Sequence, residues 1–421
     1  MPVILPEPCF DMSATNLKIL YLAHRVPFPP NKGDKIRSFN EIKYLSQEHE
    51  IHLACLIDDP KDVQHVSGLE RFVRTIDYVL ISPFRQKLKA LHFFLTGQPL
   101  SVPYFYSSEL QTAVDKRLAE IDFDVIFCFS SPMAEYVFKS RHYRDGRLGR
   151  ARLIMDFVDV DSDKWRMYAG FSSFPFSLIY HREWLCLQKY DARVGRAFSR
   201  SIFVSEKEVE LYRSFCPDAD SQAIANGVDQ DFFAVTENMR SEACKGASPA
   251  TLLFMGAMDY YPNVDAVVYF AEDIWPMVKE KIPTAQFIIA GSNPTARVRD
   301  LARRDRSITV TGAVPDIRRY LAQADIFIAP FRIARGIQNK ILEAMAAGVA
   351  VVARPEAVQG FGRQPSCITV ATNADDFASA VLALLMNENA RAAITQEAKE
   401  FVCSTFCWQD NMNALQRILL M

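Results

Sequence analysis

Short apolar runs alternate with helix-like segments along almost the whole chain of 421 residues. In the first half, candidate strands lie at 17–23, 51–57, 77–82, 124–129, 152–157 and 200–205, with a seventh at 222–225. After a polar stretch the rhythm restarts, with candidates at 251–256, 286–290, 308–311, 325–329, 349–353 and 367–370. The spacing leaves room for a helix between most strands, which is typical of parallel, doubly wound sheets. The sequence therefore predicts an α/β protein with two Rossmann-like domains.

The domain boundaries are placed where this rhythm stops. The expected parts are a loose lead-in at 1–16, an N-terminal domain at 17–233, a linker at 234–250, a C-terminal domain at 251–390 and an amphipathic helix at 391–421. A return of that last helix to the N-terminal domain is left open. In open α/β sheets, ligands bind beyond the carboxyl ends of the strands. Two such domains facing each other predict a binding cleft between them.

Composition excludes several classes of protein. The net charge is −2, which argues against a nucleic-acid binder driven by overall charge. The nine cysteines form no C-x-x-C pattern, which suits a reducing cytosol. No apolar run approaches the roughly 20 residues that a membrane helix needs, and the N-terminus does not read as a signal peptide. We therefore expect a cytoplasmic protein.

One segment leaves open a contact with the cytoplasmic membrane. Residues 85–106 place Arg85, Lys87 and Lys89 beside Leu91 and two phenylalanines. A basic, aromatic helix of this kind can lie on an anionic membrane surface. Packing of its apolar side inside the N-terminal domain is the alternative.

Residues 334–348, ARGIQNKILEAMAAG, carry the strongest indication of a binding site. The segment reads as a helix from Gly336 to Gly348, with Lys340 and Glu343 on one polar face. The first amides of a helix favour an anion, and Lys340 could reach the same anion. Glu343 could accept hydrogen bonds from sugar hydroxyls. Together these features describe a nucleotide diphosphate with its ribose, while a surface pair between Lys340 and Glu343 remains the simpler alternative.

The same segment resembles the C-terminal half of the Glu-x7-Glu motif of retaining glycosyltransferases of family 4, which have the GT-B fold. Other segments agree with this resemblance: FVSEKEVELY (203–212), QAIANGVDQDFF (222–233), IIAGSNP (288–294) and TGAVPDIRRYLAQADIFIAP (311–330). The pairing of GAMDYYPNVDAV with ARGIQNKILEAMAAG resembles a subgroup of sugar transferases associated with exopolysaccharide and exosortase (PEP-CTERM) gene clusters.

The resemblance implies a function and a set of site residues. It implies transfer of a sugar from a nucleotide-diphosphate donor to a glycan or lipid-linked acceptor with retention of configuration, without a bound metal or other cofactor. The donor-side residues that it suggests are Gly256, Val314, Arg332, Gly336, Ile337, Gln338, Asn339 and Glu343. The acceptor-side residues are Gly33, Asp34, Arg37 and Trp165. The catalytic candidates are Asp159, Asp161, Arg335 and Lys340.

The chain departs from the family pattern at its cationic positions. Arg335 stands where the first glutamate of the motif is expected, and Ala257 and Pro262 stand at about the places of a usual arginine and lysine. We interpret these changes as linked, so that Arg332, Arg335 and Lys340 supply the missing positive charge to the diphosphate. Two alternatives remain, namely a non-catalytic GT-B scaffold and a GT-B sugar-nucleotide epimerase.

Two segments of the first domain are expected at the same cleft. Gly33 is expected to open a helix with Asp34 and Arg37 in its first turns, where Arg37 could hold an acceptor phosphate or be solvated. The segment 156–169 carries four aspartates within eight residues, which would be costly to bury together. By the resemblance, Asp159 and Asp161 point toward the reacting carbon, with Trp165 as an aromatic wall; a solvated loop is the alternative.

Overall fold

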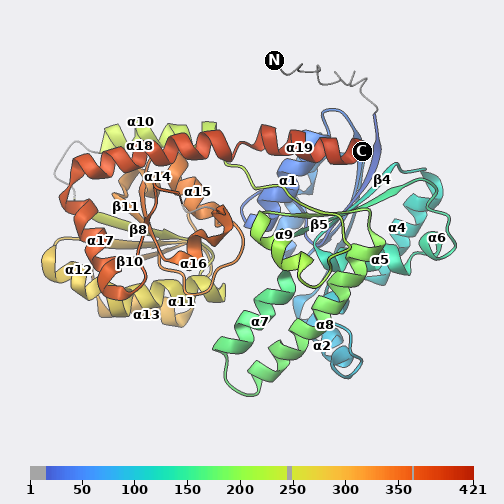
Figure 1. The fold of residues 1–421 in the computed structure, drawn as a ribbon, viewed down its shortest axis with the longest axis horizontal. Helices are drawn as coiled ribbons and strands as arrows, with labels where there is room; N and C mark the ends of the chain where they lie inside the picture. The colour runs from blue at the N-terminus through green and yellow to red at the C-terminus, as the bar shows by residue number, and fades with distance from the viewer. Residues whose placement is uncertain (1–15, 244–248, 363–364) are drawn as a thin grey trace, which may run out of the picture.

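The structure, a computed structural model, describes residues 16–243, 249–362 and 365–421, and consists of two α/β domains (Figure 1). The N-terminal sheet is wholly parallel and has the order β3-β2-β1-β4-β5-β6-β7. Its strands are β1 (Lys18–Ala23), β2 (Glu50–Ile57), β3 (Thr75–Leu80), β4 (Val125–Phe129), β5 (Arg152–Val158), β6 (Arg200–Phe203) and β7 (Ser221–Ala223). Buried side chains form a separate core on each face of this sheet.

Helices connect these strands, as the parallel pairing requires. They are α1 (Gly33–Leu45), α2 (Pro83–His92), α3 (Ser101–Tyr104), α4 (Ser108–Glu120), α5 (Ala134–Lys139), α6 (Arg141–Arg144), α7 (Asp161–Phe171), α8 (Phe176–Ala197) and α9 (Glu206–Arg213), with 3₁₀ turns η1 (Pro60–Leu69), η2 (Phe93–Leu95) and η3 (Ser131–Met133). The hairpin of α7 and α8 projects from one end of the domain (Figure 1).

The C-terminal sheet is also parallel, in the order β10-β9-β8-β11-β12-β13. Its strands are β8 (Thr251–Met255), β9 (Gln286–Ala290), β10 (Ile308–Gly312), β11 (Ile326–Ala329), β12 (Ala350–Ala353) and β13 (Thr369–Val370). Its helices are α10 (Gln230–Ala243), α11 (Tyr261–Tyr269), α12 (Trp275–Lys281), α13 (Ala296–Arg304), α14 (Arg318–Gln323), α15 (Asn339–Ala346), α16 (Pro355–Val358), α17 (Ala374–Met386) and α18 (Glu388–Thr405), with short turns η4 (Phe270–Ile274) and η5 (Gln359–Phe361). The predicted fold class and all thirteen predicted strands are confirmed.

The linker interpretation of 234–250 is wrong for residues 234–243, which belong to helix α10. Phe233 near its start is buried in the C-terminal core and α10 packs against α14, so this polar helix covers the C-terminal domain. Polar composition alone does not separate such a helix from a linker. Residues 244–248 of the predicted linker and most of the predicted lead-in lie outside the described residues.

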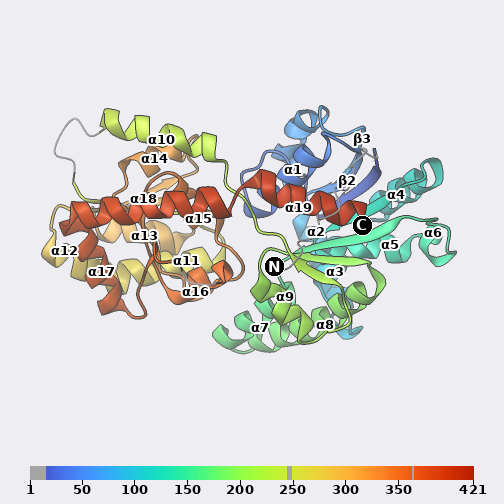
Figure 2. The ribbon, with the colours of Figure 1, turned by 45° about the horizontal axis from the view of Figure 1, so that its top comes forward.

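The single helix predicted at 391–421 is two helices, because the chain leaves helical geometry at Phe406 and Cys407. The second helix, α19 (Trp408–Leu420), packs Trp408 and Met412 into the N-terminal core. Figure 2 shows α18 on one domain and α19 on the other. Residues 406–407 thus form one of two crossings between the domains.

The second crossing lies beside the first. Val228 pairs with Cys407 in a parallel bridge, and the Val228 amide donates to the Phe406 carbonyl at 2.9 Å. These two crossings form a narrow connection next to the facing ends of both sheets. None of the helices in the described part of the chain is both long and apolar enough to cross a bilayer.

Candidate active site

The segment 334–348 lies beyond the carboxyl end of β11 as a loop followed by α15. The helix begins at Asn339 and not at Gly336, because Gly336 has a φ of +56°, outside the helical region. A Cβ at Gly336 would collide with the carboxylate of Asp159 in the N-terminal domain. The side chain of Ile337 is buried in the C-terminal core, so of this residue only the main chain can meet a donor.

Lys340 lies in the first turn of α15 and points toward the end of β8. Its Nζ donates to Asn263 Oδ1 at 2.7 Å and lies 4.8 Å from the ring centre of Phe331. A Cβ at Gly256 would lie 3.1 Å from the same Nζ, so glycine leaves the ammonium group accessible at this point. Asn263 lies inside α11, where its side-chain oxygen accepts this hydrogen bond from Lys340. The structure therefore brings the predicted donor residue Gly256 together with the predicted catalytic residue Lys340.

The surroundings of Lys340 and Glu343 shift the pKa of each side chain toward its neutral form. Burial lowers the pKa of Lys340 to about 8, although Glu343 acts in the opposite direction. Burial raises the pKa of Glu343 to about 7, against the effect of Lys340. Among the described residues, the only hydrogen bond of Lys340 goes to the neutral amide of Asn263. A partly buried cation with a neutral partner is typical of a site that receives an anion.

Arg335 reaches across to the N-terminal domain. Its Nη2 lies 2.9 Å from Asp163 Oδ2, and its Nε lies 3.6 Å from Glu208 Oε1. Arg335 therefore neutralises two carboxylates of the other domain. Its charge already has partners in this arrangement, so its role as a cation for the diphosphate stays a prediction.

Arg332 is also paired, within the C-terminal domain. Its guanidinium makes a two-pronged contact with Asp265 of α11 and lies 4.8 Å from the ring centre of Tyr269. The structure thus brings one of the three proposed cations, Lys340, to the end of β8. Gln338 donates to the Arg335 carbonyl at 2.7 Å, and Asn339 accepts from Asn226 at 2.9 Å. The donor loop is therefore held by both domains.

Asp159 follows a bulge in β5, where Val158 has a φ of +68°. Its Oδ1 is buried and has no hydrogen-bond partner among the described residues. Burial and the nearby charges of Glu208 and Asp161 raise the pKa of Asp159 to about 8, while Lys164 and Arg335 oppose this shift. Asp159 therefore carries a proton at neutral pH in this arrangement.

The other three aspartates of the segment have cationic partners. Asp161 Oδ1 accepts from Lys164 at 2.5 Å, and Asp163 pairs with Arg166 as well as with Arg335. Asp156 is fully buried against Arg37. The solvated-loop alternative does not hold for this segment. Within the described parts of the chain, no three potential metal ligands converge.

A cavity of about 100 Å³ lies between the domains. The N-terminal side contributes Asp159, Asp161 and Lys164, and the C-terminal side contributes Tyr260 and Arg335. The two aspartates predicted as catalytic thus face the donor loop across this cavity. Lys340 and Glu343 do not line it.

The sequence did not indicate the roles of two residues in this region, Glu208 and Lys164. Ser205 and Glu208 read as a capping box, in which the glutamate would only cap a helix. Glu208 instead accepts from the Val160 amide at 2.7 Å and from the Gly336 backbone. The pairing of Lys164 with Asp161 could not be predicted, because the two side chains become neighbours only when α7 forms.

The acceptor-side residues are separated by the structure. Gly33 begins α1, and a Cβ there would lie 3.7 Å from Asn339 Nδ2, so this helix start faces the donor helix. Arg37 is wrong as an acceptor-binding residue, because it is 0% exposed. Its guanidinium lies 2.6 Å from Asp156 and 3.1 Å from Glu41, where it holds α1 to β5.

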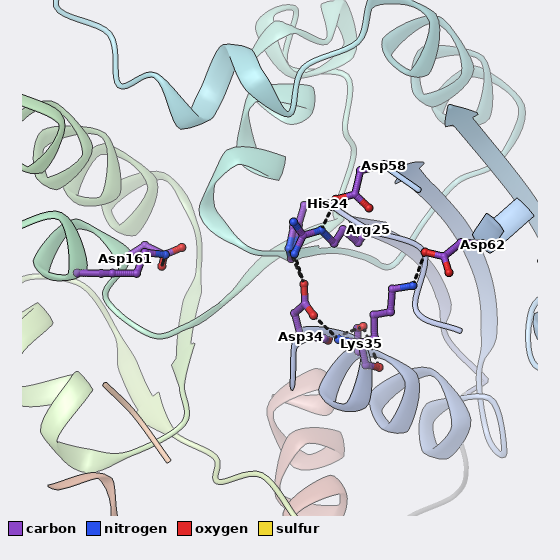
Figure 3. A network of polar contacts seen from close by, with 9 residues as sticks. His24, Arg25, Asp34, Lys35, Asp58, Asp62 and Asp161 are labelled. Carbon is purple, nitrogen blue, oxygen red and sulfur yellow. Dashed lines mark hydrogen bonds and ion pairs between the residues drawn. The ribbon is translucent and has the colours of Figure 1, made fainter. Parts of the chain in front are cut away.

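Asp34 belongs to a network of charges beyond the end of β1 (Figure 3). It accepts from Arg25 at 2.7 Å and lies 3.3 Å from His24 Nε2, while Arg25 also bonds Asp58 at 2.7 Å. Burial alone would raise the pKa of Asp34, but His24 and Arg25 hold it well below its usual value. Asp34 is therefore a fixed carboxylate.

Trp165 and Val314 are the remaining predicted residues. Trp165 is half-buried and packs against Tyr168 and Tyr180, with ring centres 5.7 and 5.4 Å away. Val314 follows β10, two strands from β8, and its contact with a donor base stays a prediction.

Comparisons with known proteins agree with this arrangement. Residues 249–387 match the family described as glycosyl transferases group 1. The chain is 22% identical over 323 residues to an uncharacterized glycosyltransferase, MJ1069, of Methanocaldococcus jannaschii, covering 72% of this chain and 76% of the relative. It is 33% identical over 138 residues to the phosphatidyl-myo-inositol mannosyltransferase of Mycobacterium tuberculosis, covering 32% of this chain and 35% of that enzyme.

Solved structures share the fold over almost the full length. Sucrose-phosphate synthase from Thermosynechococcus elongatus superposes with a TM-score of 0.70 at 16% identity, covering 96% of this chain and 98% of that one. Anabaena Alr3699/HepE, solved in complex with UDP and glucose, superposes with a TM-score of 0.67 at 14% identity, covering 96% and 99%. The chain is thus a glycosyltransferase with the GT-B fold, and its residues 249–387 match the family of group 1 glycosyl transferases.

Proposed function

We propose that this enzyme moves a sugar from a nucleotide-diphosphate donor to a glycan or lipid-linked acceptor, with retention of configuration. In this proposal it is a cytoplasmic family 4 enzyme of the exopolysaccharide-associated subgroup. The complexes of HepE with UDP and glucose support the donor class, and the name of the mycobacterial mannosyltransferase supports a lipid-linked acceptor. Free cysteines throughout the described residues suit a reducing compartment.

The environment of Lys340 is the observation that best supports the proposal. The ammonium group of Lys340 is partly buried, and its hydrogen-bond partner Asn263 is neutral. A diphosphate bound beside it would replace Asn263 and provide a negative charge opposite the ammonium group. Glu343, one turn further along α15, would accept the ribose hydroxyls. Stabilisation of the departing diphosphate by a fixed cation is an effective form of electrostatic catalysis. The chemistry is then a matter of positioning and charge neutralisation.

The N-terminal domain would complete the site from the opposite side. Asp159 is protonated below about pH 8, so in this arrangement it would donate a hydrogen bond to a substrate oxygen. Asp161 and Lys164 form a pair whose proton-accepting and proton-donating groups face the same cavity. Their contact with the acceptor stays a proposal.

Replacing Glu343 by alanine is expected to weaken donor binding about 100-fold, because a carboxylate that accepts hydrogen bonds from ligand hydroxyls contributes about 1.5–3 kcal/mol per charged hydrogen bond. Calorimetry with a panel of UDP, GDP and ADP sugars would identify the donor and measure this loss. Glu280→Ala, on the exposed surface of α12, is the matched control and should bind like the wild type. Unchanged affinity in Glu343→Ala would refute this assignment.

Donor affinity is expected to be highest between about pH 7 and pH 8. Lys340 loses its proton above about pH 8, and Glu343 gains one below about pH 7, so each limb removes a charge that the donor needs. Lys340→Ala should abolish the alkaline limb, and Glu343→Gln should abolish the acid limb. A profile that stays flat from pH 6 to pH 9, measured by calorimetry, would contradict both assignments.

Incubation of the donor alone separates transfer from the rival epimerase activity. A transferase leaves the donor sugar unchanged in NMR spectra apart from slow hydrolysis, whereas an epimerase inverts one ring carbon without an acceptor. Absence of binding by every nucleotide sugar would favour the scaffold alternative.

A further inference from the structure

The N-terminal domain exposes a large apolar surface at the end that carries the α7–α8 hairpin. Nine of the seventeen large hydrophobic residues exposed in the described chain lie in two segments, 84–95 and 171–185. They are Phe84, Leu88, Leu91, Leu95, Phe171, Phe174, Phe176, Leu178 and Leu185. We call these nine side chains the basal surface. Monomeric proteins rarely expose so concentrated an apolar patch without a partner.

Helix α2 presents its apolar stripe outward. Phe84, Leu88 and Leu91 recur at helical spacing and are 71%, 55% and 62% exposed. The buried positions of the same helix are Gln86 and Ala90. The alternative in which this helix packs its apolar side inside the domain is therefore wrong for this stripe.

The hairpin lies beside the segment that follows α2. Arg182 of α8 donates to the carbonyls of Phe93 and Gln98 at 3.1 and 2.9 Å, which ties the end of α2 to the middle of α8. Phe174, at the tip between α7 and α8, is 81% exposed. Figure 1 shows this hairpin projecting beyond the rest of the domain.

The exposed charges on α2 are positive, because Arg85 and Lys87 both lie at the surface. Residues 83–108 and 164–182 contain no aspartate or glutamate, although the whole chain has a net charge of −2. The same two segments carry six cations: Arg85, Lys87, Lys89, Lys164, Arg166 and Arg182. The last three pair with Asp161, Asp163 and Glu183, so the three cations of α2 carry most of the positive charge offered to a bilayer. Apolar side chains surrounded by lysine and arginine complement an anionic lipid surface, where both effects add.

An open groove of about 620 Å³ lies on the hairpin itself. Arg166 and His181 contribute polar groups to it, and Phe174 and Leu178 contribute apolar ones. This combination suits a lipid with an anionic headgroup.

We propose that the basal surface docks this enzyme onto an anionic lipid bilayer. Helix α7 begins at Asp161 on the cavity wall and ends at Phe171 on the basal surface, a distance of about 16 Å for its eleven residues. Docking would therefore hold the cavity about the length of α7 away from the part of the basal surface that meets the bilayer. This last point rests on the proposed function, because it concerns a lipid-linked acceptor.

Sedimentation with lipid vesicles tests the docking directly. The full chain should bind vesicles of 30% phosphatidylglycerol in phosphatidylcholine and should bind pure phosphatidylcholine at least tenfold more weakly. Arg85→Ala combined with Lys87→Ala should lower binding about 25-fold, at about fivefold per charge. Phe174→Ser should lower it about tenfold, since an inserted aromatic ring is lost. All these side chains are exposed, so the variants should fold normally.

Matched substitutions elsewhere on the surface provide the controls. Met386→Ser removes an equally exposed apolar side chain from α17, and Lys281→Ala combined with Arg303→Ala removes two exposed cations from the C-terminal domain. Both variants should bind vesicles like the wild type. Equal losses in the control variants, or no vesicle binding by the wild type, would overturn the proposal.

Self-association must be measured in the same samples. A concentration-dependent dimer that disappears in Phe174→Ser, together with absent vesicle binding, would show that the surface meets a second copy instead, and would also overturn the proposal. Donor calorimetry without vesicles reports on the proposed function separately, and the basal variants should retain wild-type donor affinity.

Discussion

Lys340→Met is expected to lower kcat/KM by about 10²–10³-fold, the usual effect of removing one fixed group that stabilises developing charge. The ammonium group of Lys340 is the cation that the structure places at the end of β8, beside Asn263 and Gly256. Methionine keeps the unbranched side chain between Phe331 and Phe254 and shortens it by one atom, so packing should survive. Initial rates with the donor found by calorimetry would measure the effect.

Stability separates this loss from a folding defect. Removal of a cation whose partner is only an amide should leave the thermal midpoint unchanged or raise it. Lys281→Met, an exposed lysine on α12, is the control and should keep full activity. Activity of Lys340→Met within threefold of the wild type would exclude Lys340 as the catalytic cation.

Arg335→Glu is expected to separate the domains and abolish activity, even though it introduces the glutamate that the resembled motif carries at this position. Arg335 lies between Asp163 and Glu208, and Asp159 packs against the next residue, Gly336. A glutamate would replace these two favourable pairs by repulsion from the carboxyl groups of Asp163 and Glu208. Loss of a partly buried pair typically costs about 3–5 kcal/mol, which is enough to reverse a closed-to-open equilibrium.

Small-angle scattering would detect this opening as an increase in the radius of gyration. Arg332→Glu is the matched control, because its partner Asp265 lies in the same domain and the interdomain contact should persist. Arg335→Lys keeps the charge and should remain mostly closed. An unchanged radius of gyration in Arg335→Glu would show that Arg335 does not hold the domains together.

The two expected results also bear on the scaffold alternative. A scaffold without activity would not require a lysine whose ammonium group is hydrogen-bonded to a neutral amide and has a pKa near 8. The departure at Arg335, which suggested lost catalysis, has a structural explanation, because the arginine neutralises carboxylates that a glutamate would repel.

Local sequence determined the strands of this protein, the order of its domains and the glycine at which helix α1 begins. Buried strands such as VAVVA and DIFIA read correctly because their apolar runs must be covered on both faces of a parallel sheet. Gly33 read correctly as the start of a helix, and the polar face of α15 read correctly as the location of Lys340 and Glu343.

Only the tertiary structure decided which charges remain available. Arg37 and Arg335 are both arginines, but their surroundings differ. Arg37 is buried between Asp156 and Glu41, whereas Arg335 pairs with a carboxylate of the other domain. Their partners lie far away along the chain and become neighbours only when the sheets form. The exposure of the apolar stripe of α2 was also decided by the tertiary structure, because the same spacing of apolar residues fits a buried face and an exposed face. Helical periodicity shows that a face exists, whereas the packing of the whole chain determines what that face meets.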